Sequence, residues 1–398
     1  MMASPLGLPH VTYPSFDPKL ETSVDGQRCW WKWQKYLRKQ PWEGIMKEDQ
    51  RKSASSLTRR RFGTATLVLG SASVFNFSIG GRAKAASGKV TFYSTMPTNY
   101  ASKMVEAFHQ TKIAKDNDIK LEMFFVNGFA LYERAVAEYT AGRVSHDLIM
   151  LTDPSLFITL KKDGRLMNYV SPELQAYPAD QRDPDGLWCN GRMVLTIYGY
   201  NTRQVSDGNK LTSWADLVNP KYSDGKIGIV NALEAGSALQ NYYNIRNHPD
   251  LGKKWWQELA ALKPTIVGGP SPLTKMNISG QTALALNNDY NVYEESKKGA
   301  PIASVYPTEI VTASIVPMAI AKAAPNPEAA KIVYDWWLSR EGQTLLRDIN
   351  SIHSGRSDVP PLPGLRSFKD LPVKVAPTQE LEANRDELQR EFKDIFKL

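Results

Sequence analysis

Cysteine and histidine are scarce in this chain of 398 residues, which has two cysteines and five histidines. The cysteines, Cys29 and Cys189, form no CxxC pair, and the histidines are scattered without metal-ligand spacing. HExxH, CxxCH, P-loop and nucleophile-elbow motifs are absent as well. We therefore interpret Cys189 as a packed small residue and expect neither a resident cofactor nor catalysis, with an exported enzyme as the rival class.

Net charge is the second thing that most of the chain lacks. Of the 49 basic and 41 acidic residues, 14 and 6 lie in residues 1–86, so residues 87–398 carry 35 of each. The net charge of +8 therefore belongs to the N-terminal segment alone. Because nucleic-acid binding requires a basic surface, the balanced charge of residues 87–398 argues against a nucleic-acid partner.

Residues 57–87 have the three parts of a secretory signal peptide: a basic start, an uncharged middle that extends through Ile79, and small residues around Ala85. The start, Thr-Arg-Arg-Arg-Phe at residues 58–62, resembles a twin-arginine export signal. We predict export by the twin-arginine translocase, cleavage near Ala85 and a periplasmic product. A retained membrane anchor is the alternative, because the uncharged middle approaches the length of a bilayer span.

Residues 1–45 show no helical or alternating apolar period. We interpret them as a non-native or disordered extension. In the first case translation begins at Met46, and residues 46–86 form the signal peptide.

After residue 86, strand-like and helix-like segments alternate. Strands are expected at residues 89–94, 119–125 and 146–151, each followed by a helix, and a long strand at residues 193–200 leads into a second round of alternation. About 310 residues exceed the size at which one core keeps growing. We predict an α/β protein of two lobes, with an interlobe cleft and hinge strands, rather than one large sheet.

The predicted domain boundaries follow from this alternation. Residues 87–192 form the first part of lobe 1 and residues 193–300 form lobe 2. Residues 301–398 contain the return crossing, the rest of lobe 1 and an amphipathic C-terminal helix.

Several runs resemble the extracellular solute-binding proteins of bacterial ABC importers, in particular the branch of ferric-ion-binding proteins. These runs are residues 90–94, 212–222, 226–229, 299–301, 305–307, 324–331 and 338–343. We expect a soluble monomer, and the resemblance implies a periplasmic binding protein type II fold. It also implies closure of the two lobes over a ligand and delivery to a permease in the inner membrane.

Ligands of open α/β sheets bind beyond the carboxyl ends of the strands. The candidate ligand-binding residues therefore follow the predicted strands: Ser94, Thr95, Asn127, Gly128, Asp153, Gly236, Ser237, Asn288, Asp289 and Tyr290. Ser237 lies where a helix begins, and the unpaired amides of a helix N-terminus attract anions. The alternative is that Ser237 only caps that helix.

In ferric-binding relatives, the loop similar to residues 287–290 supplies two adjacent tyrosines. Here Asp289 stands in place of the first and Tyr290 remains, and the histidine often found in the first turn is missing from residues 94–98. Asp289 and Tyr290 are predicted metal ligands only if ferric ion, Fe3+ with a bound anion, is the transported ligand.

The same cleft suits a small organic or organophosphorus anion such as a phosphonate. A polyamine is a third option, which would need more carboxylates than Asp153 and Asp289. A ligand sensor that reports to a membrane receptor is the alternative to a transport role.

Overall fold

The computed structural model describes residues 87–126 and 128–398. The predicted signal peptide, its cleavage site and the extension before it lie outside these residues. Among the helices of the described part, none combines the length and the apolar character that a membrane span requires.

Strands and helices alternate along the described residues much as the sequence predicts. The strands are β1 (Gly88–Ser94), β2 (Ile119–Phe125), β3 (Leu148–Met150), β4 (Cys189–Asn201), β5 (Ile227–Val230), β6 (Thr265–Val267), β7 (Leu284–Asn288), β8 (Ile302–Val305), β9 (Val311–Ile320) and β10 (Val373–Lys374). The α-helices are α2 (Thr98–Gln110), α3 (Lys112–Asp116), α4 (Gly128–Thr140), α5 (Ser155–Lys162), α6 (Gly236–Arg246), α7 (Gly252–Ala261), α8 (Pro270–Ser279), α9 (Asp289–Lys297), α10 (Pro327–Leu338), α11 (Arg340–Asn350) and α12 (Thr378–Phe396).

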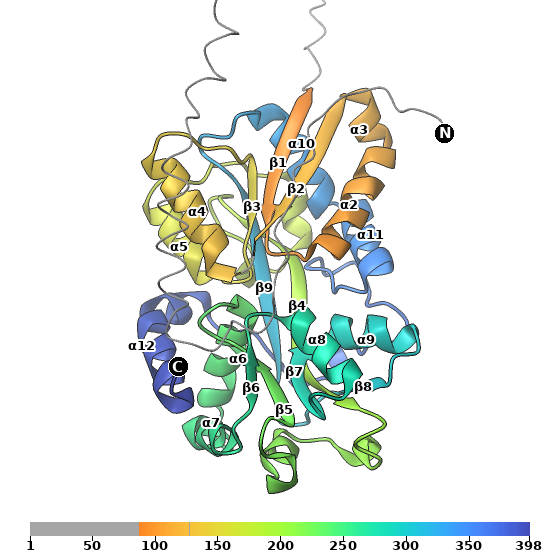
Figure 1. The fold of residues 1–398 in the computed structure, drawn as a ribbon. Helices are drawn as coiled ribbons and strands as arrows, with labels where there is room; N and C mark the ends of the chain where they lie inside the picture. Colours follow the sequence, from red (N-terminus) through yellow and green to blue (C-terminus); the bar gives the residue numbers. More distant parts are fainter. Residues whose placement is uncertain (1–86, 127) are drawn as a thin grey trace, which may run out of the picture. The chain divides into compact units, whose positions relative to one another are not determined.

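The strands lie in the order β2-β1-β3-β9-β4-β7-β5-β6, with β10 paired to β9 and β8 paired to β4. In lobe 1, β1 pairs in parallel with β2 and β3, and in lobe 2, β5 pairs in parallel with β6 and β7. The long strands β4 and β9 are antiparallel and extend through both lobes (Figure 1). The predicted two-lobed α/β fold is confirmed. The expectation that the lobes would not share one large sheet was wrong, because β4 and β9 pair along most of their length and join all ten strands of the described residues.

The chain passes between the lobes three times. β4 leads from lobe 1 to lobe 2, β9 returns, and residues 351–377 lead back to lobe 2, where β10 pairs with the start of β9. The predicted return crossing corresponds to β9, whereas β8 pairs with the lobe 2 part of β4. The exact domain boundaries stay a prediction.

Each lobe has its own apolar core, which fixes the elements that carry the cleft. In lobe 1, Phe92 of β1 packs edge-on against Trp337 of α10, with ring centroids 5.2 Å apart. In lobe 2, Tyr242 of α6 packs against Phe392 of α12 at 5.3 Å. Cys189 is fully buried, which confirms that it is a packed residue.

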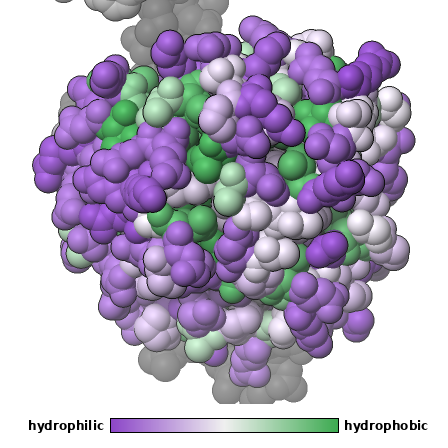
Figure 2. Space-filling model, turned by 90° about the horizontal axis from the view of Figure 1, so that it is seen from below, coloured by the Kyte–Doolittle hydropathy of each residue, from purple (hydrophilic) through white to green (hydrophobic). Residues whose placement is uncertain are grey.

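The surface seen from below, which is the lobe 2 end of Figure 1, is mostly hydrophilic, and its hydrophobic side chains lie in small groups (Figure 2). Isolated apolar groups of this kind are ordinary on a protein surface. This face therefore shows no single large apolar patch that would indicate a permanent partner.

Two helices that shape the cleft were not predicted from the sequence. α8 begins Pro-Ser-Pro, which reads as a turn, and α9 begins within the stretch 287–290 that was expected to be a loop. In the structure Asn288 ends β7 and Asp289 begins α9. The loop expectation was therefore wrong at the position that matters most for the site.

Candidate functional site

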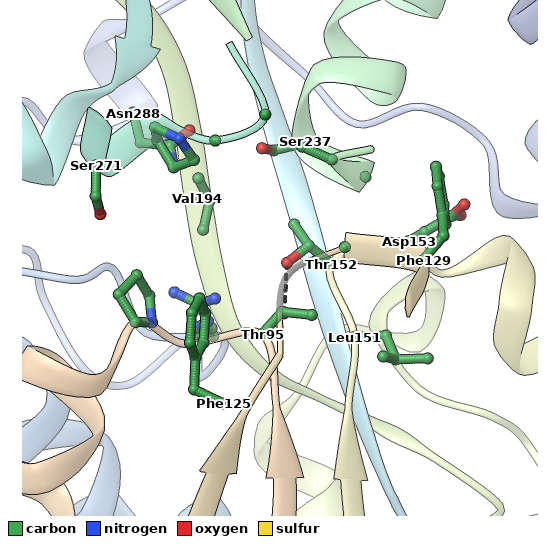
Figure 3. Close-up of a pocket in the computed structure, with 18 of the residues that line it drawn as sticks. Thr95, Phe125, Phe129, Leu151, Thr152, Asp153, Val194, Ser237, Ser271 and Asn288 are labelled. Atoms are coloured by element: carbon green, nitrogen blue, oxygen red, sulfur yellow. Dashed lines mark hydrogen bonds between the residues drawn. The ribbon is translucent and has the colours of Figure 1, made fainter. Parts of the chain in front are cut away.

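A cavity of about 450 Å³ lies between the lobes, beyond the carboxyl ends of β1, β2 and β3. Figure 3 shows Thr95, Phe125 and Thr152 at the lobe 1 strand ends, facing Ser237, Ser271 and Asn288 of lobe 2. The Thr95 and Thr152 hydroxyl groups are hydrogen-bonded to each other at 2.8 Å. A cavity of this volume suits a small organic molecule, whose pockets span about 300 to 1,000 Å³.

Six helices from both lobes begin at the cavity wall. Their lining residues, each in the first or second helical position, are Thr98 of α2, Gly128 of α4, Leu156 of α5, Gly236 of α6, Pro270 of α8 and Tyr290 of α9. The first turn of a helix carries unpaired amide groups and a partial positive charge. Together these termini make the cavity attractive to an anion.

The N-terminus of α6 has no side-chain cap, and neither do those of α2, α8 and α9. The cap residue of α6 is Ala235, which offers no side-chain acceptor, and Ser237 lies inside the first turn. The alternative that Ser237 caps this helix is therefore wrong. The amide groups of the first turn are left without a side-chain cap at the cavity wall.

Arg192 of β4 is a charged wall residue that the sequence analysis missed. Its side chain is only 2% exposed, and its Nε and Nη1 atoms have no hydrogen-bond partner. A buried cation without a partner carries a large desolvation cost. An anion in the cavity would supply the missing negative charge.

A break in strand pairing explains the position of Arg192. The register of β4 against β9 shifts between Asn190 and Met193, and such a bulge re-aims the side chains it contains. The Gly191 carbonyl oxygen accepts hydrogen bonds from Trp337 Nε1 and Gln343 Nε2, both at 2.9 Å, which hold the bulge. The only sequence signal was an arginine directly before the apolar run at residues 193–195.

Among the described residues, Asp153 is the one acidic residue in the cavity wall. Its Oδ1 atom accepts hydrogen bonds from the backbone amide and the hydroxyl group of Ser155, and Arg385 Nε lies 3.4 Å from Oδ2 without hydrogen-bond alignment. Burial raises the pKa of this carboxyl group, while Arg385 and Ser155 oppose the increase. Oδ1 is therefore committed to Ser155, whereas Oδ2 has only the nearby charge of Arg385.

The structure places Asp289 away from the cavity wall. Asp289 is fully buried, and its Oδ2 atom lies 2.7 Å from His353 Nε2 and 3.4 Å from the Tyr306 hydroxyl group. Tyr290 does line the cavity, and its hydroxyl group accepts a 3.4 Å hydrogen bond from Asn288 Nδ2. The pair predicted to bind metal therefore points in two directions, because consecutive residues of a helix face different sides.

The remaining predicted residues divide in the same way. Seven of the ten line the cavity together: Thr95, Gly128, Asp153, Gly236, Ser237, Asn288 and Tyr290. Ser94 is fully buried, where its hydroxyl group accepts from the Met96 amide, and Asn127 lies outside the described residues. Ligand binding by these residues stays a prediction.

The two lobes touch at the edge of the cavity. Gln240 Nε2 of α6 donates a 2.7 Å hydrogen bond to the Thr152 carbonyl oxygen of lobe 1. A Cβ atom on Gly236 would lie 2.7 Å from the Asp153 amide nitrogen, and one on Gly128 would overlap the Glu234 carbonyl oxygen at 1.4 Å. Glycine is thus required at both positions for the lobes to approach this closely.

Across the described residues, no three His, Cys, Asp or Glu side chains are grouped as a metal site. The hard oxygen ligands in the cavity wall that could take an anionic form are the Asp153 carboxylate and the Tyr290 phenol. Ferric ion prefers several such ligands. The wall is therefore better suited to an anion than to a bare cation.

Comparison with known proteins adds information on the family and the fold. The profile of a family described as "Bacterial extracellular solute-binding protein" matches residues 144–370, more than half of the chain. An uncharacterized protein from Haemophilus influenzae is 29% identical over an alignment of 201 residues, with 46% of this chain and 55% of that protein covered. The chain thus spans about half the length of the curated relative it matches.

Two solved structures share the fold. Iron-bound HitA from Pseudomonas aeruginosa has a TM-score of 0.66 and 20% identity, with 77% of this chain and 99% of that chain covered. The periplasmic binding protein AfuA from Actinobacillus pleuropneumoniae, solved with fructose-6-phosphate bound, has a TM-score of 0.67 and 19% identity, with 78% and 99% covered. At this identity the likeness confirms the two-lobed periplasmic binding protein fold and leaves the ligand open.

Proposed function

Because the chain belongs to the bacterial extracellular solute-binding proteins, we propose that it captures a small organic anion between its lobes and delivers it to an ABC permease. The observation that carries this proposal is the buried, unpartnered Arg192 in a cavity where helix N-termini from both lobes meet. Phosphate and carboxylate groups are the natural partners of such a wall. Closure of the lobes provides the binding energy by excluding water, and no catalytic step is needed.

The size and lining of the cavity favour an organic anion over an inorganic one. Phe125, Phe129, Leu151 and Val194 line it together with the polar groups. An apolar wall gains binding energy only from a ligand that carries apolar surface. We therefore propose an organophosphate, phosphonate or carboxylate with an organic body.

Ferric ion with a bound anion is the second candidate, and Tyr290 is the observation that favours it, because its phenol lies in the cavity wall. The helix N-termini would then hold the accompanying anion. Against it, Asp289 lies outside the wall and Asp153 is paired with Arg385. A polyamine is disfavoured by the single carboxylate in the wall.

A thermal melt of the protein with separate additions of inorganic phosphate, fructose-6-phosphate and ferric ion plus phosphate distinguishes these candidates. A ligand at a hundred times its dissociation constant adds about 2.7 kcal/mol. For a folded part of about 310 residues the expected increase in Tm is about 4 °C. A visible tyrosinate band that appears with iron and disappears in Tyr290→Phe would establish ferric ion as the ligand and refute the proposal of an organic anion.

A matched pair of variants at Ser237 tests the α6 terminus. Ser237→Pro removes one first-turn amide, which has no acceptor within the helix, whereas Ser237→Ala removes only the hydroxyl group. A hydrogen bond to a charged group contributes about 1.5 to 3 kcal/mol, so the proline variant should bind an anion about 10- to 150-fold more weakly. Equal affinities of the two variants by calorimetry would show that this amide is not used.

We also propose twin-arginine export with cleavage near Ala85 and function as a monomer in the periplasm. N-terminal sequencing of the exported protein tests the cleavage, and precursor sequencing tests the start at Met46. Loss of solute uptake on deletion would support transport rather than a sensory role, since both use the same closure.

A further inference from the structure

The C-terminal helix α12 is anchored in lobe 2 but extends to lobe 1. Its apolar residues Leu381, Leu388 and Phe392 are buried in the lobe 2 core. Glu391 accepts hydrogen bonds from the Tyr242 hydroxyl group at 2.7 Å and from Arg246 Nε at 3.1 Å, both on α6. These contacts fix α12 to lobe 2.

The other side of α12 contacts α5 of lobe 1 (Figure 1). There the Arg385 guanidinium lies over the Phe129 ring of α4, 4.2 Å from its centroid, and 3.4 Å from Asp153 Oδ2. Phe129 and Asp153 lie together at one edge of the ligand cavity (Figure 3). A second ion pair joins α5 to α12 nearer the surface, with Lys162 Nζ 2.6 Å from Glu382 Oε1.

Opening of the lobes would separate each of these pairs. The Asp153 side chain is 2% exposed, so its carboxylate would lose its counterion as α12 moved away. The Phe129 ring would lose the guanidinium that covers it. A planar guanidinium can stack on a ring and face a carboxylate at the same time, which a lysine ammonium cannot do.

We propose that Arg385 is a closure residue, which holds lobe 1 against α12 and stabilises the closed arrangement of the lobes. The cavity that it closes is the ligand cavity of the proposed function, and on that function the proposal rests. Arg385 also balances the one carboxylate in a wall that otherwise attracts anions, so that Asp153 does not repel the ligand. Arg385 should affect the dissociation rate of the ligand, because its contacts with Phe129 and Asp153 form only once the lobes meet.

The experiment measures lobe separation directly by electron–electron resonance between two spin labels. Glu106→Cys on α2 and Lys254→Cys on α7 place labels at exposed positions of the two lobes, in a Cys29→Ser background. Cys189 is buried and stays unlabelled. Arg385→Met keeps the aliphatic length of arginine but removes the guanidinium, and Arg390→Met, at an exposed position of the same helix, is the matched control.

In ligand-free protein we expect Arg385→Met to shift the distance distribution toward longer separations and Arg390→Met to leave it unchanged. Phe129→Leu, which removes the stacking partner from the lobe 1 side, should shift it in the same direction and replaces Arg385→Met if that variant fails to fold. Distance distributions of Arg385→Met and the wild type that coincide would overturn the proposal.

The second readout uses fructose-6-phosphate and inorganic phosphate as probes. The contacts of Arg385 predict about a tenfold faster dissociation from Arg385→Met at an unchanged association rate. If neither probe binds the wild type, the organophosphate form of the proposed function fails, while the ligand-free distances still test the role of Arg385 in closure. If a probe binds and dissociates at the same rate from the wild type and from Arg385→Met, the closure role of Arg385 is refuted and the anion site stands.

Discussion

Replacing Arg192 with methionine should have opposite effects on the stability of the ligand-free protein and on anion binding. In the wild type a cation that is only 2% exposed has two nitrogen atoms without a hydrogen-bond partner. Methionine has a similar length and adapts to irregular packing, so the substitution removes the desolvation cost without opening a large void. We expect the ligand-free protein to become more stable by about 1 to 3 kcal/mol.

The binding side of this prediction follows from the electrostatics of the cavity wall. A positive charge about 5 Å from an anion attracts it by roughly 3 kcal/mol at an effective dielectric constant of about 20. Desolvation of the ligand offsets part of this attraction. A loss of about 1.5 to 3 kcal/mol is therefore expected, which weakens binding about 10- to 150-fold.

Urea unfolding of ligand-free wild type and Arg192→Met measures the first effect, and calorimetry with whichever anion raises the Tm measures the second. Arg192→Lys is a control that keeps the charge and should retain most of the affinity. A variant that loses stability without ligand would show that Arg192 is a structural residue. Unchanged affinity would show that its charge does not reach the ligand.

Four further predictions concern the lobe contact, the buried pair at Asp289 and the pH dependence of stability at His146 and at Glu138. Gly236→Ala places a Cβ atom 2.7 Å from the Asp153 amide nitrogen, and this overpacking should oppose closure by about 1 to 3 kcal/mol. Calorimetry should then show anion binding weakened about 5- to 150-fold, while the stability measured by urea unfolding stays normal. Asp289→Asn should lower the free energy of unfolding by about 1 to 3 kcal/mol, because it removes the carboxylate partner of His353. The anion affinity should stay within about threefold of the wild type, and a larger loss of affinity would return Asp289 to the ligand site. Burial lowers the pKa of His146 below 6.5, so below pH 6.5 the unfolded chain binds a proton that the folded protein does not, and stability should fall as the pH decreases. In urea unfolding at several pH values, His146→Gln should reduce this dependence of stability on pH. Burial alone would raise the pKa of Glu138, but hydrogen bonds from Tyr93, Ser145 and His146 lower it from 4.5 to about 2, which adds a second loss of stability below pH 4.5 in acid titrations.

Much of lobe 1 could be predicted because its signals are local. β2 spans the predicted residues 119–125, and α5 follows the strand predicted at residues 146–151, as expected. The helices that were missed, α8 and α9, follow turn-like residues. Local sequence rules read Pro270, Pro272 and the asparagines before α9 as breakers, whereas packing against β4 and β7 makes both segments helical.

The candidate site was predictable to the extent that it depends on strand ends. Thr95, Gly128, Gly236 and Ser237 follow strands or open helices, and all four line the cavity. Arg192 could not be found in this way, because it lies within a strand, at a bulge that only the pairing with β9 reveals. Asp289 was assigned to the site by its neighbours, but its partner His353 is 64 residues away.

The sequence by itself determined the alternation of strands and helices, the two lobes and the loops from which a ligand site would be built, because hydrophobic period and turn residues act over a few positions. Only the tertiary structure decided which polar groups share the cavity and which are consumed in buried pairs. It set Arg192 in the wall without a partner, turned Asp289 toward His353, and brought Arg385 from the C-terminal helix onto Phe129 and Asp153. The physical reason is that a charge acquires its role from the burial and the partners around it, and these come from segments that lie far apart in the chain.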